Sequence, residues 1–146
     1  MLDSIKSIPK DMALNLIFEC HYSKVMPRIT KYYIGGFIKD ELVAVMTLGW
    51  GVRPVHTIKK IFPTLDVNDY FELGKLCVKD KCPKNTESYF ISQCIKLIQK
   101  ELPKLKILFS WADGIIGKPG YVYQCSNFYY GGFIWTEMYL DANGNR

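Results

Sequence analysis

The segment from residue 85 to residue 102 restricts the fold of this chain more than any other part of the sequence. Its apolar residues recur at the spacing of one helix face, which predicts a helix of about 17 residues ending before Pro103. Asn85 is a favourable N-terminal cap for such a helix. The apolar face needs a second layer to cover it. The residues of that face are Phe90, Ile91, Cys94, Ile95, Leu97, Ile98 and Leu102.

Runs rich in β-branched and aromatic residues precede this helix. Residues 31–40 and 41–49 predict a hairpin, and residues 70–78 predict a strand. Gly74 lies inside that strand and is a candidate β-bulge. The glycine pair at 35–36 marks either a bulge or a close approach of two backbones.

The other segments alternate between helix and strand. Residues 8–20 and residues 53–63 follow helical spacing, whereas residues 106–112 predict a buried strand. Further on, residues 120–127 predict a short helix and residues 128–139 a last pair of strand segments. This order predicts a mixed α/β (α+β) fold with a central sheet flanked by helices.

Length and composition suit one compact domain over residues 1–146, because 49% of the residues are apolar. The net charge of +5 favours an anionic partner, such as nucleic acid or a phosphorylated cofactor, although many basic proteins bind neither.

The cysteines and the apolar runs indicate the compartment. Five cysteines, an odd number without a CxxC pair, indicate reduced intracellular thiols rather than a disulfide framework or a zinc site. No run approaches the ~18 apolar residues that a bilayer-spanning helix needs, and no basic head precedes an apolar run at the N-terminus. We therefore expect a soluble cytoplasmic protein with no membrane partner.

Residues 110–132 carry most of the candidate functional side chains. They place one acid, five glycines and four tyrosines between two apolar runs. Asp113 follows a predicted buried strand, where open α/β sheets bind their ligands, and it is either a base or acceptor in a cleft or an acid that caps a turn. Gly114, Gly117 and Gly120 would let a ligand approach the backbone, but they also fit an ordinary glycine-rich turn.

The predicted short helix offers further candidates. The phenol of Tyr121 or Tyr123 could donate a proton to a leaving group or orient a substrate, although tyrosine is also common at the rim of a core. The amides of Gln124 and Asn127 lie between aromatic residues and need partners, which are either buried backbone or substrate.

His21 and Tyr22 form a second candidate cluster with two acids. A histidine at a helix C-terminus needs no function, since the macrodipole favours it there. If the first helix packs over the strand ends, these two residues could meet Glu72 and Asp113 and offer nitrogen and oxygen ligands suited to iron or another divalent metal. The metal set would be His21, Tyr22 and Asp113, and it has no spacing signature.

Three lysines precede the long predicted helix. Lys79, Lys81 and Lys84 lie next to the helix N-terminus, where the dipole and the cations together favour a phosphate. A solvated basic turn explains the same residues.

With these residues in view, the chain resembles the Mom family of phage DNA-modification proteins, which share the fold of GCN5-related N-acyltransferases. Three blocks that cover most of the chain carry the resemblance, and the third, with its Tyr-Gln-x-x-Asn-Phe core, is the most specific. The blocks are residues 21–24 with Pro27; residues 72–77 with Asp80, Pro83, Lys84 and Asn85; and Ser110, Ala112, Asp113, Gly117, Gly120, Tyr123, Gln124, Asn127, Phe128 and Tyr130.

The resemblance implies a mixed, mostly antiparallel sheet in which acyl-coenzyme A lies in a splay beside a bulged strand. It also implies an enzyme that adds a carbamoylmethyl- or methylcarbamoyl-type group to adenine N6 in phage DNA, which protects that DNA from host restriction enzymes. The partners would be DNA and an acyl donor, acetyl-coenzyme A or a relative of it, in the host cytoplasm.

On this resemblance Tyr22, Asp113 and Tyr123 lie nearest the chemistry, with His21 and Glu72 in support. The N6 amine is a poor nucleophile because its lone pair is delocalised into the ring, so a base or a metal-bound group must help. A flipped-out adenine would stack on Tyr and Trp side chains. The substrate-binding candidates are Ser110, Gln124, Asn127 and Tyr130, and the candidates for the donor phosphates are Lys79, Lys81, Lys84, Asn85 and Ser88.

One departure from the acyltransferase pattern leaves alternatives open. Such enzymes carry an Arg/Gln-x-x-Gly-x-Gly/Ala pyrophosphate loop, and residues 79–88 contain no glycine. Another donor or a metal-assisted route therefore stays open. The alternative functions are N-acyl transfer from acyl-coenzyme A to a small-molecule or protein amine, and a non-catalytic DNA- or nucleotide-binding domain of the same fold.

Overall fold

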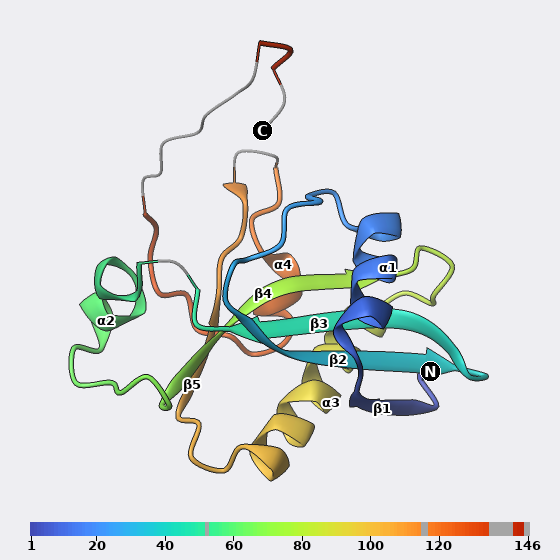
Figure 1. Ribbon diagram of the computed structural model, residues 1–146, viewed down its shortest axis with the longest axis horizontal. Helices are drawn as coiled ribbons and strands as arrows, with labels where there is room; N and C mark the ends of the chain where they lie inside the picture. Colours follow the sequence, from blue (N-terminus) through green and yellow to red (C-terminus); the bar gives the residue numbers. More distant parts are fainter. Residues whose placement is uncertain (52, 115–116, 135–141, 145–146) are drawn as a thin grey trace.

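The computed structural model describes residues 1–51, 53–114, 117–134 and 142–144. This part of the chain is built on a five-stranded sheet in the order β1-β2-β3-β4-β5 (Figure 1). The first three pairings are antiparallel and the β4–β5 pairing is parallel, which confirms the expected mixed, mostly antiparallel sheet. The strands are β1 (Ser4–Ser7), β2 (Thr30–Ile38), β3 (Glu41–Gly49), β4 (Tyr70–Val78) and β5 (Ile107–Ser110).

Two helices flank the sheet. Helix α1 (Lys10–Cys20) lies on one face and α3 (Thr86–Glu101) on the other (Figure 1). A one-turn 3-10 helix, η1 (Pro54–His56), and the short α2 (Ile58–Ile61) connect β3 to β4, and α4 (Tyr121–Gln124) follows β5.

Neighbouring residues of β3 pack against opposite helices. Val45 belongs to a buried cluster with Ile17 of α1, whereas Met46 belongs to the cluster that contains Phe90 of α3. This is the two-residue period of a strand covered on both faces. Each such apolar side chain contributes about 1.5–3 kcal/mol when it is buried. The layered arrangement expected from the sequence is therefore confirmed.

The glycine pair in β2 marks a close approach. A Cβ added at Gly36 would lie 2.9 Å from the Leu2 side chain and 3.0 Å from Phe90, so a side chain there would collide with the core under α3. The strand register shifts just after Gly36, where Ala44 and Leu42 of β3 are paired but the residue between them is not. The bulge at this point therefore lies in β3.

The first helices follow the sequence prediction with local differences. Pro9 is the N-cap of α1, so the helix begins two residues later than the predicted range 8–20. Residues 53–63 form two short helices, because Thr57 between them has φ −119° and ψ −105°, which no continuous helix adopts.

The cap of α3 also differs in detail. Asn85 precedes the helix, as expected, but it has φ 70° and its side chain makes no capping hydrogen bond. The Thr86 hydroxyl donates to the Pro83 carbonyl at 2.6 Å instead.

Three strand predictions need correction. β1 was not expected, because four residues with one apolar side chain give little signal, and their pairing with β2 supplies the structure. β5 is shorter than residues 106–112. Residues 128–134 contain no strand, since Asn127 (φ 62°) and Gly132 (φ 100°) break the extended backbone, and residues 135–139 lie outside the described residues.

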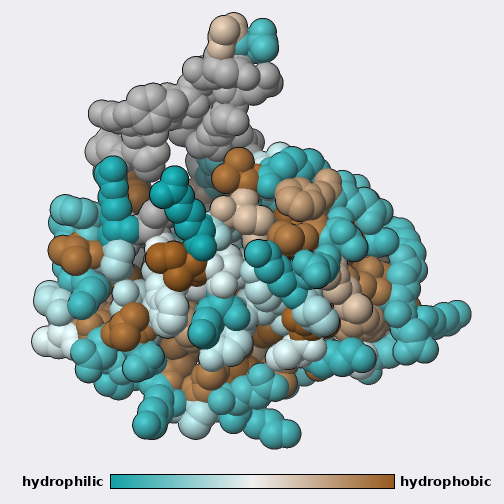
Figure 2. All heavy atoms as spheres, in the orientation of Figure 1, coloured by the Kyte–Doolittle hydropathy of each residue, from teal (hydrophilic) through white to brown (hydrophobic). Residues whose placement is uncertain are grey.

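The surface is mixed in polarity. Figure 2 shows hydrophilic side chains over much of one face, with apolar side chains in separate patches between them. Among the described residues, no helix combines the length and the apolar character required to cross a membrane.

Candidate active site

The strands β4 and β5 separate in the middle of β4. Their parallel pairing ends at Leu73 and Ser110, while β4 continues to Val78 and stays paired with β3. The Ser110 hydroxyl donates a 3.0 Å hydrogen bond to the Leu73 carbonyl, so a side chain of β5 binds a backbone acceptor of β4 at the end of the pairing. The second half of β4 is thus left with one strand neighbour in the described part of the chain.

Gly74 forms a bulge at the same point. Thr47 of β3 pairs with Lys75 and the next residue of β3 pairs with Leu73, so Gly74 has no partner of its own. The Lys75 amide donates to Thr47 Oγ1 at 2.9 Å. A Cβ at position 74 would lie 3.0 Å from the Pro27 ring. The bulge predicted from the sequence is confirmed, and the close contact with Pro27 explains the glycine.

His21 and Tyr22 follow α1 and lie on the α1 side of this bulge. Their rings are stacked, with centroids 4.4 Å apart. Burial, followed by the charge of Lys75, lowers the pKa of His21 to about 4, so the ring is neutral at pH 7. His21 Nδ1 lies 3.0 Å from both the amide and the carbonyl of Ser23, so it accepts from the amide in one tautomer of the neutral ring and donates to the carbonyl in the other. His21 Nε2 is therefore a donor in the first tautomer and an acceptor in the second.

Glu72 is the acid that the structure buries at the end of the β4–β5 pairing. Only 9% of its side chain is exposed, and Trp111 Nε1 donates to Oε2 at 3.3 Å. Burial raises the pKa of Glu72, and the hydrogen bond from Trp111 offsets part of this rise. A Cβ at Gly51 would lie 2.0 Å from the same oxygen, so the carboxyl group is enclosed by backbone.

The splay of the sheet is the point after Leu73 and Ser110 where β4 and β5 separate. Tyr123 lies at this point, on the α3 side of the sheet. Burial raises the pKa of its phenol, while a side-chain hydrogen bond with Ser110 lowers it in part. Its ring packs against Phe128, with centroids 5.4 Å apart. Tyr121, two residues earlier on α4, is 70% exposed. Of the two tyrosines, Tyr123 is thus the one held at the strand ends as a protonated donor.

The glycine-rich loop after β5 reaches the His21–Tyr22 pair. Lys118 places its ammonium group 5.1 Å from the centroid of the Tyr22 ring, and its amide donates to the Asp113 carbonyl at 3.1 Å. Gly117 and Gly120 have φ 72° and 82°, in the left-handed region that favours glycine, whereas Gly114 does not have a positive φ. Tyr22 and the loop that begins at Asp113 thus lie together.

Three of the substrate-binding candidates lie on the surface. Gln124 and Asn127 are exposed, and Tyr130 is 83% exposed. Ser110, the fourth candidate, is the one that contacts the strand ends.

Three residues of the site were not predicted: Lys75, Trp111 and Lys118. Lys75 carried a signal, because a lysine directly after a bulge glycine in an apolar strand is unusual. Trp111 and Lys118 flank Asp113 in the sequence, but their contacts depend on residues 39 and 96 positions away.

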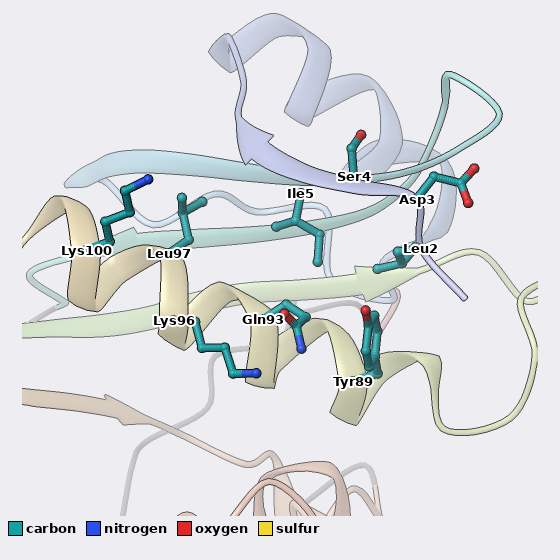
Figure 3. A pocket seen from close by; sticks show the side chains of 9 residues that line it. All are labelled: Leu2, Asp3, Ser4, Ile5, Tyr89, Gln93, Lys96, Leu97 and Lys100. Atoms are coloured by element: carbon teal, nitrogen blue, oxygen red, sulfur yellow. The ribbon is translucent and has the colours of Figure 1, made fainter.

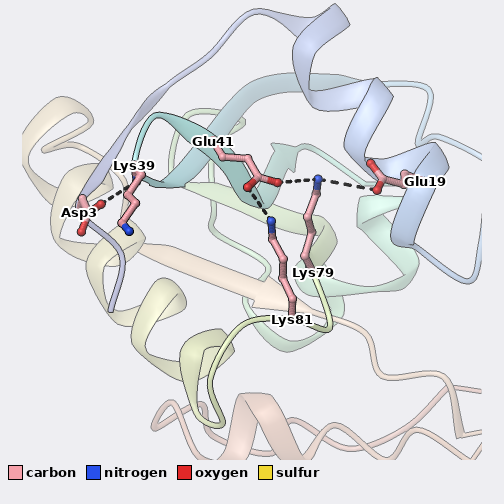
Figure 4. Close-up of polar contacts among 6 residues, drawn as sticks. All are labelled: Asp3, Glu19, Lys39, Glu41, Lys79 and Lys81. Atoms are coloured by element: carbon pink, nitrogen blue, oxygen red, sulfur yellow. Dashed lines mark hydrogen bonds and ion pairs between the residues drawn. The ribbon is translucent and has the colours of Figure 1, made fainter.

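The basic loop after β4 is partly neutralised. Lys79 and Lys81 both contact Glu41 at the β2–β3 turn, and Lys79 also lies 3.7 Å from Glu19 (Figure 4). Lys84 is exposed beside the N-terminus of α3. Two of the three lysines expected at phosphate therefore face carboxylates in this structure.

Two hollows lie near α3. One, of about 240 Å³, is lined by residues 78–80 and 82–87 and so includes Lys79, Lys84 and Asn85; the hydroxyl of Ser88 donates to the Asn85 carbonyl beside it. The other, of about 340 Å³, lies between β1 and α3, and its lining includes Ile5 of β1 with Lys96, Leu97 and Lys100 of α3 (Figure 3). The predicted site residues line only the first.

The metal hypothesis gains no support from the donor set. Within residues 1–51, 53–114, 117–134 and 142–144, no three His, Cys, Asp or Glu side chains come together in a way that would hold a metal ion. His21 instead contacts Tyr22 and Ser23, and Glu72 contacts Trp111. The predicted set of His21, Tyr22 and Asp113 contains two such side chains and a phenol, so it stays a prediction, and we assign no chemical step to a metal.

Comparison with known proteins agrees with this geometry. The Mom protein family matches residues 4–145. The chain belongs to the Mom protein family. A relative in this family, the methylcarbamoylase mom of Escherichia phage Mu, is 31% identical over 124 residues, which are 85% of this chain and 51% of that protein. The chain thus spans about half the length of this relative.

Solved structures show that this member of the Mom family has an acetyltransferase fold. A possible acetyltransferase from Clostridium difficile 630 superimposes with a TM-score of 0.61 over 96% of this chain and 99% of its own, at 12% identity. A ribosomal-protein-alanine N-acetyltransferase from Brucella melitensis biovar Abortus 2308 gives a TM-score of 0.60 over 93% and 98%, also at 12% identity. The fold expected from the resemblance is confirmed.

Proposed function

We propose that this protein is a DNA-modifying transferase that adds a methylcarbamoyl- or carbamoylmethyl-type group to N6 of adenine in phage DNA and so protects that DNA from host restriction. The observation that carries the proposal is the family match over residues 4–145, which includes both the His21–Tyr22 pair and the Ser110–Tyr123 pair. The name of the phage Mu relative, a methylcarbamoylase, supplies the group that we propose is transferred.

Exposed aromatic rings beside the splay support a nucleobase as the acceptor. Tyr22 is 53% exposed and Trp111 is 38% exposed, and both lie next to buried polar groups of the site. A flipped-out base needs a stacking surface together with hydrogen-bond partners for its edge. Nε2 of His21, on the ring stacked with Tyr22, is suited to the edge of adenine, which carries both ring-nitrogen acceptors and an amino donor.

Two proton transfers must accompany the reaction. The donor, when bound, supplies a carbon that bears a leaving group, a carbonyl carbon for a methylcarbamoyl group or a methylene carbon for a carbamoylmethyl group; the bond from that carbon to the leaving group breaks as its bond to N6 forms. We assign to Asp113 the acceptance of the proton that N6 loses. We assign to Tyr123 the return of a proton to the leaving group, because burial keeps its phenol protonated and Ser110 orients it.

The side of β4 that is left without a strand neighbour in residues 1–51, 53–114, 117–134 and 142–144, together with the start of α3, is suited to an acyl donor. The strand beyond Gly74 has backbone groups directed at the splay, and the hollow at residues 78–87 lies where β4 leads into α3. Lys84, Asn85 and Ser88 surround the N-terminus of α3, which favours anions such as the phosphates of acyl-coenzyme A. Lys79 and Lys81 would join them only by leaving Glu41.

Mass spectrometry of nucleosides tests the proposal. DNA from cells that express the wild type should contain a heavier deoxyadenosine, and the added mass identifies the group. Asp113→Ala should abolish this product. Tyr123→Phe should reduce it by about 10²-fold or more, as expected for loss of a general acid. Tyr121→Phe is the matched control, since it removes an exposed phenol from the same helix.

The acetyltransferase fold favours one second candidate, transfer from acyl-coenzyme A to a free or protein amine. Incubation of the purified protein with acyl-coenzyme A and a panel of amines, with and without DNA, separates the two. Acylation of an amine without DNA, together with unmodified nucleosides in expressing cells, would replace DNA modification by this alternative.

A further inference from the structure

Lys75 is a buried cation to which the proposed reaction gives no task. Only 7% of the residue is exposed. It lies on the α1 side of β4, the side on which Cys77 is also buried. Lysine is among the residues least often buried, because the removal of an ammonium group from water is costly unless the group is hydrogen-bonded. The lowered pKa of Lys75, caused by burial, is consistent with this cost.

The ammonium group of Lys75 has a specific acceptor. Its Nζ donates to the Ser23 carbonyl at 3.2 Å, across 52 positions of the sequence. Ser23 in turn donates its amide to His21 Nδ1 at 3.0 Å, and the His21 ring stacks on Tyr22. One side chain of β4 is thus tied to the turn that carries both aromatic candidates.

The bulge sets the position of this side chain. Because Gly74 has no partner in β3, the strand resumes its pairing at Lys75, whose amide is fixed by Thr47 Oγ1 at 2.9 Å. The backbone of Lys75 is therefore held from β3 while its side chain holds residues 21–23, at the point where β4 separates from β5.

We propose that Lys75 is a positioning residue, whose buried ammonium group anchors the turn at residues 21–23 and thereby fixes the rings of His21 and Tyr22 at the splay of the sheet. This inference rests on the proposed function for its effect on catalysis, but the anchoring itself does not depend on that function. A displacement of about 1 Å in a reacting group can lower a rate by 10²-fold.

Three variants separate anchoring from packing. Lys75→Met keeps the length and apolar stem but removes the donor, Lys75→Arg keeps a cationic donor, and Lys24→Met is the matched control. Lys24 also donates to a backbone carbonyl, that of Phe18 at 2.6 Å, from the same segment, but it is exposed.

We expect Lys75→Met to stay folded, with little change in melting temperature, because relief of the buried charge offsets the lost hydrogen bond. Amide hydrogen exchange at residues 21–24 should become roughly tenfold faster or more, since the turn loses its anchor. DNA modification should fall by about 10²-fold. Lys75→Arg should restore part of both properties, and Lys24→Met should resemble the wild type.

The outcomes distinguish the two proposals. Normal exchange at residues 21–24 and full modification in Lys75→Met would overturn the anchoring role. Equal loss in Lys75→Arg and Lys75→Met would overturn it as well, because shape rather than the donor would then matter. If the wild type modifies no DNA, the proposed function fails, and hydrogen exchange alone decides the role of Lys75. Lys75→Gln, with a shorter side chain, replaces the Met variant if that variant does not fold, with the same exchange criterion.

Discussion

The two halves of β4 differ in their strand neighbours. Residues 70–73 all pair with β5, residues 72 and 73 also pair with β3, and all four are buried. Residues 75–78 pair with β3 alone in the described part of the chain, and they include the buried Lys75. The change occurs at Gly74, the bulge residue. The first half thus lies between two strand neighbours, whereas the second half has one such neighbour and begins with a buried cation, Lys75.

The difference shows where stability and function can be separated. A side chain in the first half is surrounded by the core, so its loss leaves a cavity. In the second half a polar side chain already bears a burial cost, and its replacement by an apolar one need not weaken the fold. Substitutions on the two sides of Gly74 should therefore differ in the property that they damage.

The largest effect on stability is expected from Leu73→Ala. Leu73 is 2% exposed and belongs to the cluster under α3, so its truncation should lower the free energy of unfolding by about 2–5 kcal/mol. Leu76→Ala, in the second half and only half-buried, is the control and should cost less. Urea unfolding measures both. Equal losses would contradict the contrast between the halves.

A smaller, pH-dependent effect is expected from Glu72→Gln. The folded state raises the pKa of this acid above 4.5 through burial, so it binds the proton more tightly than the unfolded state does. The stability that Glu72 contributes is therefore fully present below pH 4.5 and is lost as the pH rises through the folded pKa. Glu72→Gln should raise the melting temperature at pH 7 relative to the wild type, and this advantage should shrink towards pH 4.

Thermal unfolding followed across this pH range tests the sign. Glu101→Gln, an exposed carboxylate at the end of α3, is the control for the change in net charge. An advantage of Glu72→Gln that grows as the pH falls would contradict the assigned burial effect.

Local signals in the sequence predicted much of the sheet. Gly74 inside an apolar strand indicated the bulge, and residues 31–49 indicated the β2–β3 hairpin, because both depend on neighbours in sequence. β1 escaped prediction since its four residues acquire strand geometry only by pairing with β2. The positive φ of Gly132, which interrupts the predicted strand, was not predicted either, because the aromatic residues around it are typical of a strand.

The site was predicted in its residue types more than in its contacts. His21, Tyr22 and Tyr123 were named from the sequence; the structure stacks the first two rings and places Tyr123 beside Ser110, and the roles of all three stay predictions. The tie from Lys75 to Ser23 could not be foreseen, because it joins two segments far apart in the sequence and depends on the register of β4. Polar contacts between distant segments are fixed by packing, which local patterns do not encode.

The smallest effect on stability is expected from Glu41→Gln, beside the C-terminal end of β4, where the strand leads into the basic loop. Glu41 pairs with Lys79 and Lys81, and all three groups are reached by solvent, so Glu41→Gln should change the melting temperature little. It should nevertheless free Lys81, leave Lys79 with Glu19 as its one carboxylate neighbour among those described above, and strengthen the binding of free coenzyme A severalfold at low salt, with the gain lost as salt is added.

Isothermal titration with coenzyme A measures this change. Glu101→Gln alters the net charge equally but lies at the other end of α3, so it should leave the affinity near that of the wild type. A gain confined to Glu41→Gln would mean that the two lysines exchange a carboxylate for a phosphate when the donor binds. Equal affinities in all three proteins would remove Lys79 and Lys81 from the donor site and leave Lys84, Asn85 and Ser88 at the helix N-terminus to hold the donor.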